Sequence, residues 1–270
     1  MSPGITTIIG TSILGISILG GFLFYNFYRR EVSSAQSLNL SSDITDRYSK
    51  LASVFDEKVD FEEKLLCLGK KRADLIRLAR GNVLEVSCGT GRNLEYYELG
   101  QQHDANSASV RSLTLVDIVP QMLDVAKEKL NTLYPEYKDA VTFRVEDAGS
   151  VSVELPSNRE SSSATCYDTI VQTMGLCSIP DPLGTLKHLA TIIEPHHGRI
   201  LLLEHGRSCH GWINNVMDNL APGHANRNGC WWNRDIGAIV RDSGLEIVEE
   251  KRWLFGIISR YILRPKQVPS

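Results

Sequence analysis

The chain has 270 residues, of which 42% are hydrophobic and 23% charged, as in ordinary globular proteins. This length suffices for one α/β domain with a substantial core. A formal net charge of −3 leaves no basic surplus, which argues against nucleic acid as a partner. The six cysteines include no C-x-x-C pair and no regular spacing, so the sequence predicts neither a metal site nor a disulfide framework.

The N-terminal segment differs in character from the rest of the chain. Residues 5–28 carry no charge, end in a cluster of aromatic side chains and are followed by Arg29 and Arg30. A helix of this length, at ~1.5 Å per residue, would cross the ~30 Å hydrocarbon core of a bilayer. A secretory signal peptide fits poorly, because a basic n-region and a cleavage site are missing. The predicted layout is a tip at 1–4, a transmembrane helix at 5–28, a linker at 29–42 and a globular domain at 43–270.

Strand and helix patterns alternate through the globular part. A short helix is expected at 43–56 and a longer one at 60–81. The later elements are, in chain order, strand 82–87, a helix from about 92, strand 113–117, helix 120–133, strands 141–145 and 167–174, helix 182–193, strand 198–206, helix 233–243 and an antiparallel pair at 245–253 and 256–264. Polar stretches at 100–112 and 156–165 are expected to be surface insertions. The alternation predicts an α/β fold with a mainly parallel, seven-stranded sheet and helices on both faces.

The string VLEVSCGTGRN at 83–93 predicts a buried strand that enters a tight turn and then a helix. Gly89 and Gly91 would let the backbone approach a cofactor, and the N-terminus of the helix would offer it N–H groups. A dinucleotide fingerprint would need a small residue where Leu94 stands, which disfavours a nucleotide-dependent oxidoreductase. The pattern E-x-x-x-G-x-G, which begins at Glu85, instead resembles the first motif of Rossmann-like S-adenosylmethionine-dependent methyltransferases. The alternative is an ordinary strand–turn–helix corner.

Acidic residues at the ends of later strands would complete a nucleoside site. Asp117 ends the second strand, where a carboxylate can accept both ribose hydroxyls. Asp147 follows the third strand, where a carboxylate could accept the adenine amino group. Either acid alone could be a helix cap, but the two in this order predict S-adenosylmethionine binding. The fourth strand ends at 172–176, which would border the reacting centre.

The catalytic residue is not determined by the sequence. Methyl transfer from a sulfonium mainly needs orientation, which can contribute ~7–11 kcal/mol, and a base is needed only for a protonated, weak acceptor. Weak candidates are His205, Glu204 and Cys177. His205 titrates in a suitable range, although a structural histidine is the more common case, and Cys177 could simply be a small buried residue. The segment 230–232 would cap the acceptor side or pack in the core.

Five segments together resemble one family: VLEVSCGTGRN, TLVDIVPQML, YDTIVQTMGLCSIPDP, GRILLLEHGR and GCWWNRDIGAIVRDSGLEIVEEKR. They are similar to the fungal mitochondrial inner-membrane methyltransferase-like family, over residues 48–263. The GLCS-x-x-DP and EHG strings are more specific than the glycine turn. The chain more distantly resembles ubiquinone and menaquinone C-methyltransferases and the membrane-anchored alkyl-thiol methyltransferases of animals.

This resemblance implies a class I methyltransferase fold with S-adenosylmethionine as its cofactor. The resemblance implies that Glu85, Gly89, Gly91, Asp117 and Asp147 contact the cofactor. The predicted cofactor-binding residues also include Ser87, Ile118, Met122, Ala148 and Gln172. Tyr48 and Phe55 are implied to help close over the cofactor. Ser87 departs from the motif, which usually has its first glycine there, and a serine would crowd the backbone if that residue needed a positive φ.

The sequence therefore predicts a membrane-anchored, S-adenosylmethionine-dependent methyltransferase that acts on a small lipophilic acceptor. The bilayer would be contacted through residues 5–28, and the resemblance implies a single-pass protein of the mitochondrial inner membrane. The alternative is a catalytically weak or inactive cofactor-binding domain that serves as a membrane-tethered assembly factor. Ser87 and the lack of an unmistakable base motivate that alternative. Neither the acceptor, the side of the membrane nor the oligomeric state is specified.

Overall fold

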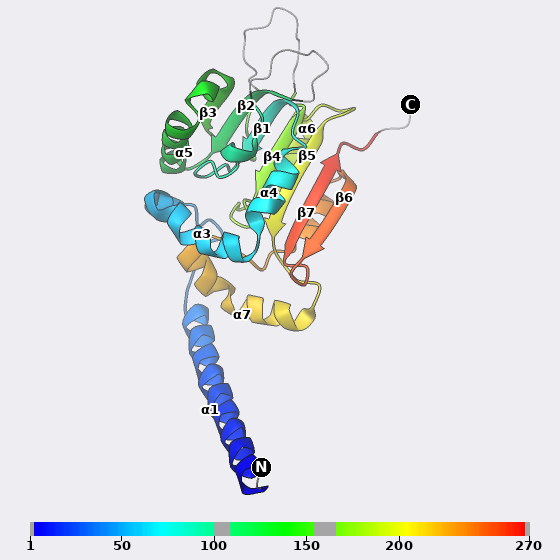
Figure 1. Ribbon diagram of the computed structural model, residues 1–270. Helices are drawn as coiled ribbons and strands as arrows, with labels where there is room; N and C mark the ends of the chain where they lie inside the picture. Colours follow the sequence, from blue (N-terminus) through cyan, green and yellow to red (C-terminus); the bar gives the residue numbers. More distant parts are fainter. Residues whose placement is uncertain (1–2, 100–108, 154–165, 268–270) are drawn as a thin grey trace, which may run out of the picture.

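The computed structural model describes residues 3–99, 109–153 and 166–267, with side chains from residue 19 onward (Figure 1). The insertion predicted at 156–165 lies outside the described residues. Residues 100–108 of the insertion predicted at 100–112 also lie outside the described residues. Residues 110–112 of that predicted insertion belong to a strand that begins at Val110.

A seven-stranded sheet forms the centre of the domain (Figure 1). Its strands are β1 (Gly81–Val86), β2 (Val110–Asp117), β3 (Val141–Val145), β4 (Thr169–Thr173), β5 (Arg199–His205), β6 (Glu246–Trp253) and β7 (Ile258–Arg264). The order is β3-β2-β1-β4-β5-β7-β6, in which β1 to β5 are parallel and β7 is antiparallel to both β5 and β6. The predicted Rossmann-like sheet with an antiparallel C-terminal pair is confirmed. Its strand order reverses between β1 and β4, where open α/β sheets bind ligands.

Helices cover both faces of the sheet, and the side chains of β5 alternate between two apolar clusters. Leu201 and Leu203 pack on one face with α4 and α5, whereas Ile200 and Leu202 pack on the other with α6 and α8. A strand covered on both faces must be nearly all apolar, which is why β5 could be predicted as central. The covering helices are α4 (Leu68–Ile76), α5 (Pro120–Leu133), α6 (Pro182–Ile192) and α8 (Ile236–Asp242).

Two helix predictions were wrong. In the described residues between β1 and β2 the chain forms only a short 3-10 turn, η2 (Leu94–Tyr96), in place of the helix expected from about residue 92. The helix predicted at 60–81 is interrupted at Cys67, whose left-handed φ of 51° separates α3 from α4. The remaining short elements are α2 (Asp46–Leu51), η1 (Ala52–Val54), α3 (Phe55–Leu65) and η3 (Pro135–Ala140).

A long helix that the sequence pattern did not predict, α7 (Gly211–Asn228), packs against the N-terminal helix α1 (Pro3–Gln36). It contains Pro222 and lacks the apolar stripe by which amphipathic helices are recognised. A Cβ at Gly223 would lie 3.4 Å from the Ala35 Cβ, so a small residue allows the close approach of the two helices. Nearby, the Asn219 amide donates to the Tyr28 hydroxyl at 3.1 Å.

The helix α1 extends away from the domain beside α7 (Figure 1). The segment predicted as a linker, 29–42, is helical up to Gln36, because this part of α1 contains neither Gly nor Pro and is supported by α7. Residues 37–45 therefore make the connection to α2 and the domain. Among the residues that the structure describes, no helix combines the length and the apolar character needed to cross a membrane.

Candidate active site

A cavity of about 810 Å³ lies at the carboxyl ends of β1, β2, β4 and β5, where ligands bind in sheets of this kind. Most site residues predicted from the sequence line it: Ser87, Gly89, Asp117, Ile118, Met122, Asp147, Ala148, Cys177 and His205. Four others are buried behind the lining: Glu85, Gly91, Gln172 and Glu204. The structure thus separates residues that can touch a ligand from residues that shape the wall.

The turn after β1 is left-handed at Ser87, Gly89 and Gly91, whose φ angles are 52°, 55° and 71°. A Cβ at Gly89 would meet no atom within 4 Å, so the backbone there borders open space in the cavity. A Cβ at Gly91 would lie 2.7 Å from Leu94 Cδ1. Gly89 therefore leaves room for a ligand, whereas Gly91 allows the turn to pack on Leu94.

Ser87 adopts the positive φ that the missing glycine would have provided, a conformation that costs an L-residue about 1–2 kcal/mol. Met174, in the loop after β4, is also left-handed, with a φ of 56°. Both residues line the cavity. Backbone strain of this kind concentrates at functional sites, where the surrounding structure holds it in place.

Asp117 joins the glycine turn to the end of β2. Its Oδ2 accepts the Gly89 N–H at 2.8 Å, and its Oδ1 accepts the Val119 N–H at 2.9 Å. Burial raises the pKa of Asp117, although the backbone N–H groups of Val119 and Gly89 counteract it. On the next loop, Asp147 is exposed, and its Oδ1 accepts the Gly149 N–H at 2.8 Å. Both predicted nucleoside acids thus border one cavity from neighbouring strands.

Glu85 supports the turn from behind. Its two carboxylate oxygens accept the Asn93 amide at 3.0 Å and the Tyr97 hydroxyl at 2.7 Å. Burial raises the pKa of Glu85 from its ordinary 4.5 to about 7, against the lowering effect of the Tyr97 and Asn93 hydrogen bonds. The first acid of the motif therefore anchors the segment that replaces the expected helix.

Helix α3 is tied to the glycine turn by ion pairs that sequence reasoning missed. The Arg92 guanidinium lies 2.8 Å from Asp60 and 3.0 Å from both Asp56 and Glu63. Asp56 also pairs with Lys129 of α5 at 2.7 Å. Burial alone would raise the pKa of Asp56, but the hydrogen bond from Lys129 contributes to lowering it. The three acids are spaced by four and three residues on one helix face, a pattern that could have indicated a shared basic partner.

Tyr48 and Phe55 approach the cavity from the segment ahead of the sheet. Their ring centroids lie 6.1 Å apart, and the Tyr48 hydroxyl is 2.6 Å from the Ser178 Oγ in the loop after β4. The N-terminal elements thus reach the opposite wall of the cavity. Their closure over a cofactor stays a prediction.

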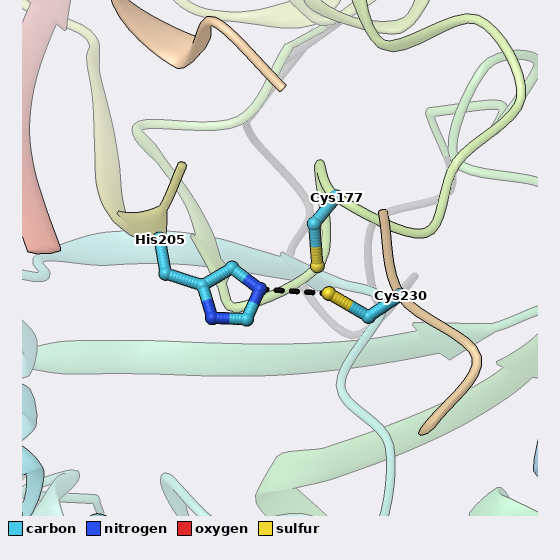
Figure 2. A group of neighbouring side chains, drawn as sticks. All are labelled: Cys177, His205 and Cys230. Carbon is cyan, nitrogen blue, oxygen red and sulfur yellow. Dashed lines mark hydrogen bonds between the residues drawn. The ribbon is translucent and has the colours of Figure 1, made fainter. Parts of the chain in front are cut away.

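The opposite wall contains the weak catalytic candidates. The side chains of Cys177, His205 and Cys230 point toward one another, and His205 Nε2 lies 2.8 Å from the Cys230 Sγ (Figure 2). Hydrogen bonding to Cys230 lowers the pKa of the Cys177 thiol despite its burial. Glu204 lies behind this group, where its carboxylate accepts the N–H groups of Gly175 and Leu176, each at 3.2 Å. A catalytic role for any of them stays a prediction.

The helix α7 contributes His224, Arg227 and Asn228 to the cavity lining, and Cys230 follows in the segment after the helix. The His224 ring stacks on Trp232, with centroids 4.2 Å apart, and burial lowers the pKa of His224 to about 4. Cys230 and Trp232 line the cavity, which agrees with the first of the two roles considered for segment 230–232. His224 was missed because no pattern indicated the helix that carries it.

The strand order, the glycine turn after β1 and the acid at the end of β2 define a Rossmann-like, class I methyltransferase domain. Residues 56–250 match the family of methyltransferase domains, and the chain belongs to this family. The mitochondrial methyltransferase OMS1 of Saccharomyces cerevisiae is 39% identical over 220 residues, which cover 79% of this chain and 44% of that protein. The chain thus spans less than half the length of that curated relative.

Solved structures show the same fold at low identity. A chain in the complex of the Haloferax volcanii Trm112 methyltransferase activator with a methyltransferase has a TM-score of 0.58 and 16% identity, covering 81% of this chain and 98% of that one. An O-methyltransferase family protein from Burkholderia thailandensis has a TM-score of 0.58 and 15% identity, covering 91% and 70%. Membership of the family, together with the open backbone at Gly89 beside Asp117, indicates S-adenosylmethionine as the cofactor.

Proposed function

We propose that the chain is the catalytic part of an S-adenosylmethionine-dependent methyltransferase that acts on a small lipophilic acceptor at a membrane. The observation that carries this proposal is the open backbone at Gly89, held by Asp117 at the edge of the cavity. Asp117 would accept the ribose hydroxyls and Asp147 the adenine amino group, and the glycine turn would contact the rest of the cofactor. Tyr48 and Phe55 would cover it.

The cofactor supplies an activated methyl group on a positively charged sulfur, which leaves as a neutral thioether when the acceptor forms its bond to carbon. The task of the chain is then to exclude water and to hold the acceptor in line with that methyl group. The cavity wall formed by β4, β5 and α7 lies opposite the glycine turn and is where we place the acceptor.

Apolar side chains support a lipophilic acceptor. Leu65, Met174 and Ile257 line the cavity. Leu65 is nevertheless 71% exposed, and Phe61, one turn earlier on α3, is 75% exposed. Exposed apolar side chains on the helix that borders the cavity suit a substrate that partitions into lipid.

Membrane anchoring through residues 5–28 is part of the same proposal. The supporting observations are the uncharged sequence of this segment and the projection of α1 from the domain (Figure 1). A mitochondrial location is supported by the relative OMS1, whose name describes it as mitochondrial. Alkaline carbonate extraction of the expressed chain should leave it in the membrane pellet, and release of the intact chain into the supernatant would contradict the anchor.

The alternative of an inactive, membrane-tethered assembly factor is not favoured. Ser87 was one reason to consider this alternative, because the motif usually has a glycine at this position. In the structure, Ser87 adopts the left-handed conformation expected of that glycine. This conformation supports the proposal that the turn still binds the cofactor.

Calorimetry with S-adenosylhomocysteine on the full, detergent-solubilised chain tests the cofactor site. Asp117→Ala removes the acceptor of two backbone N–H groups as well as the predicted ribose partner, so affinity should fall at least about 100-fold, or ~3 kcal/mol. Asp124→Ala is the matched control, because Asp124 is an exposed residue of α5. An absence of binding by the unmodified chain, or equal affinities of the two variants, would contradict the proposal.

A further inference from the structure

Three soft or borderline metal ligands meet at one point in the cavity wall (Figure 2). Cys177 comes from the loop after β4, His205 from the end of β5, and Cys230 from the segment after α7. Their ligand atoms, two Sγ atoms and one imidazole nitrogen, all lie within 4.8 Å of one another. Both cysteines are buried, at 1% and 5% exposure.

We propose that Cys177, His205 and Cys230 bind a zinc ion. Two thiolates and one imidazole are a ligand set that zinc uses in proteins, with Zn–S distances of about 2.3 Å and Zn–N distances of about 2.0–2.1 Å. In a tetrahedral site these bond lengths place neighbouring ligand atoms about 3.6–3.8 Å apart. His205 Nε2 and Cys230 Sγ are 2.8 Å apart, and all three ligand atoms lie within 4.8 Å of one another, so the spacings are close to that value. Small side-chain rotations therefore complete the geometry.

Charge balance also favours a divalent ion at this buried position. Two thiolates cancel the charge of Zn²⁺, and a neutral imidazole adds none, so the completed group is neutral. Burial of a neutral group avoids the solvation cost that an unpaired ion would bear.

The backbone holds the three ligands in place without a metal. The Glu204 carboxylate accepts the N–H groups of Gly175 and Leu176, which fixes the loop of Cys177 to the strand of His205. The Trp231 N–H donates to the Cys177 carbonyl at 3.0 Å, which fixes the Cys230 segment to the same loop. Such support of ligand positions by surrounding hydrogen bonds is characteristic of metal sites.

Three protein ligands leave a fourth position for water or substrate, as in catalytic zinc sites. All three ligands line the cavity that also contains Gly89 and Asp117, so this position is accessible to a molecule bound there. His205 would then act as a ligand and not as a free general base. This proposal departs from the expectation, based on cysteine spacing alone, that the chain has no metal site.

Metal analysis of the full chain, purified in detergent without a polyhistidine tag, tests the proposal. After incubation with Zn²⁺ and removal of excess metal, the unmodified chain should retain about one zinc ion. The variants Cys177→Ser, Cys230→Ser and His205→Ala should each lose most of it. Cys209→Ser and Cys166→Ser are matched controls, because these cysteines lie outside the cavity lining, and both should retain zinc.

Cobalt provides a readout that does not depend on activity or on the stability of a variant. Co²⁺ added to the metal-free unmodified chain should produce thiolate-to-cobalt charge-transfer bands and the intense visible absorption of a tetrahedral site, and Zn²⁺ should displace it. A chelator competition should give a zinc Kd of about 1 nM or lower.

Three results would overturn the metal site. The first is a micromolar or weaker zinc affinity of the unmodified chain, and the second is equal zinc retention in all variants. The third is a Cys177–Cys230 disulfide that persists in reduced samples. Calorimetry with S-adenosylhomocysteine on the same samples keeps the two proposals separate. A chain that binds zinc but not the nucleoside contradicts only the methyltransferase, and the reverse result contradicts only the metal site.

Discussion

The two walls of the cavity are built by different physical means. The wall around Gly89 and Asp117 consists of backbone turns fixed by carboxylates, and ion pairs hold α3 against it. The opposite wall, at Cys177 and His205, consists of sulfur, imidazole and apolar side chains. Together, our two proposals place the charged nucleoside at the polar wall, and the acceptor and a metal at the opposite wall.

The largest effect should come from the buried carboxyl group behind the polar wall. Because the pKa of Glu85 is about 7 in the fold and 4.5 ordinarily, the folded chain binds more protons between these values. Stability should therefore fall as pH rises from about 4.5 to about 7, and Glu85 should contribute about 3 kcal/mol of this loss. Glu204, whose pKa is raised by burial to about 8, should add a decline that continues to about pH 8. Glu85→Gln should remove the Glu85 part of this slope and leave the Glu204 part, as measured by urea unfolding followed by tryptophan fluorescence.

The control for that experiment is Glu246→Gln, an exposed residue at the sheet edge, which should keep the slope of the unmodified chain. A slope in Glu85→Gln equal to that of the control would show that the polar wall does not determine the pH dependence.

A smaller effect is expected from separating α3 from the glycine turn. Arg92→Ala would leave Asp60 without its ion-pair partner, whereas Asp56 and Glu63 would keep Lys129 and Arg72. Because Asp60 is partly exposed, we expect a loss of about 2 kcal/mol in unfolding free energy, below the full cost of a buried pair. Affinity for S-adenosylhomocysteine should fall about 10-fold, measured by calorimetry.

Arg264→Ala is the comparison for Arg92→Ala, since Arg264 and Glu246 form an exposed pair. It should leave the free energy of unfolding essentially unchanged, because solvent screens an exposed ion pair. Similar losses in both variants would mean that the α3 network is an ordinary surface feature.

A substitution at Ser87, which has a strained backbone, should increase stability, whereas the preceding variants should decrease it. Ser87→Gly removes the cost of a left-handed L-residue, while the added flexibility of the unfolded chain offsets part of the gain, so stability should rise by about 1 kcal/mol. Thermal unfolding should show the increase. Ser150→Gly, in an exposed turn after β3, should have no stabilising effect. A lower melting temperature of Ser87→Gly would show that the Ser87 hydroxyl matters more than the strain.

The smallest effect concerns the contact between the two walls. Tyr48→Phe removes the hydroxyl that lies 2.6 Å from Ser178 Oγ but keeps the ring. Loss of one hydrogen bond should weaken S-adenosylhomocysteine binding about 3-fold, or ~0.7 kcal/mol. Tyr25→Phe, on the exposed surface of α1, should bind as the unmodified chain does. A loss of 100-fold would mean that Tyr48 contacts the cofactor through its hydroxyl.

Elements with a strong local signal could be predicted from the sequence. Pro120 and an amphipathic pattern place α5 at Pro120–Leu133, where the structure has it, and the apolar run of β5 indicates a central strand. The alternation of these elements determines the class of fold, because a parallel sheet requires crossover helices. The helix expected after Gly91 failed for a tertiary reason, since the Arg92 and Tyr97 side chains bind α3 and Glu85 instead.

The amino-acid sequence by itself determined the glycine turn and the acid at the end of the next strand, because each is encoded by a local pattern of a buried strand followed by a turn or an acid. Only the tertiary structure decided the opposite wall. Cys177, His205 and Cys230 are about 25 residues apart from one to the next, so no spacing rule for metal ligands applies to them. They meet because β4 and β5 are paired and α7 returns the chain to the same edge of the sheet.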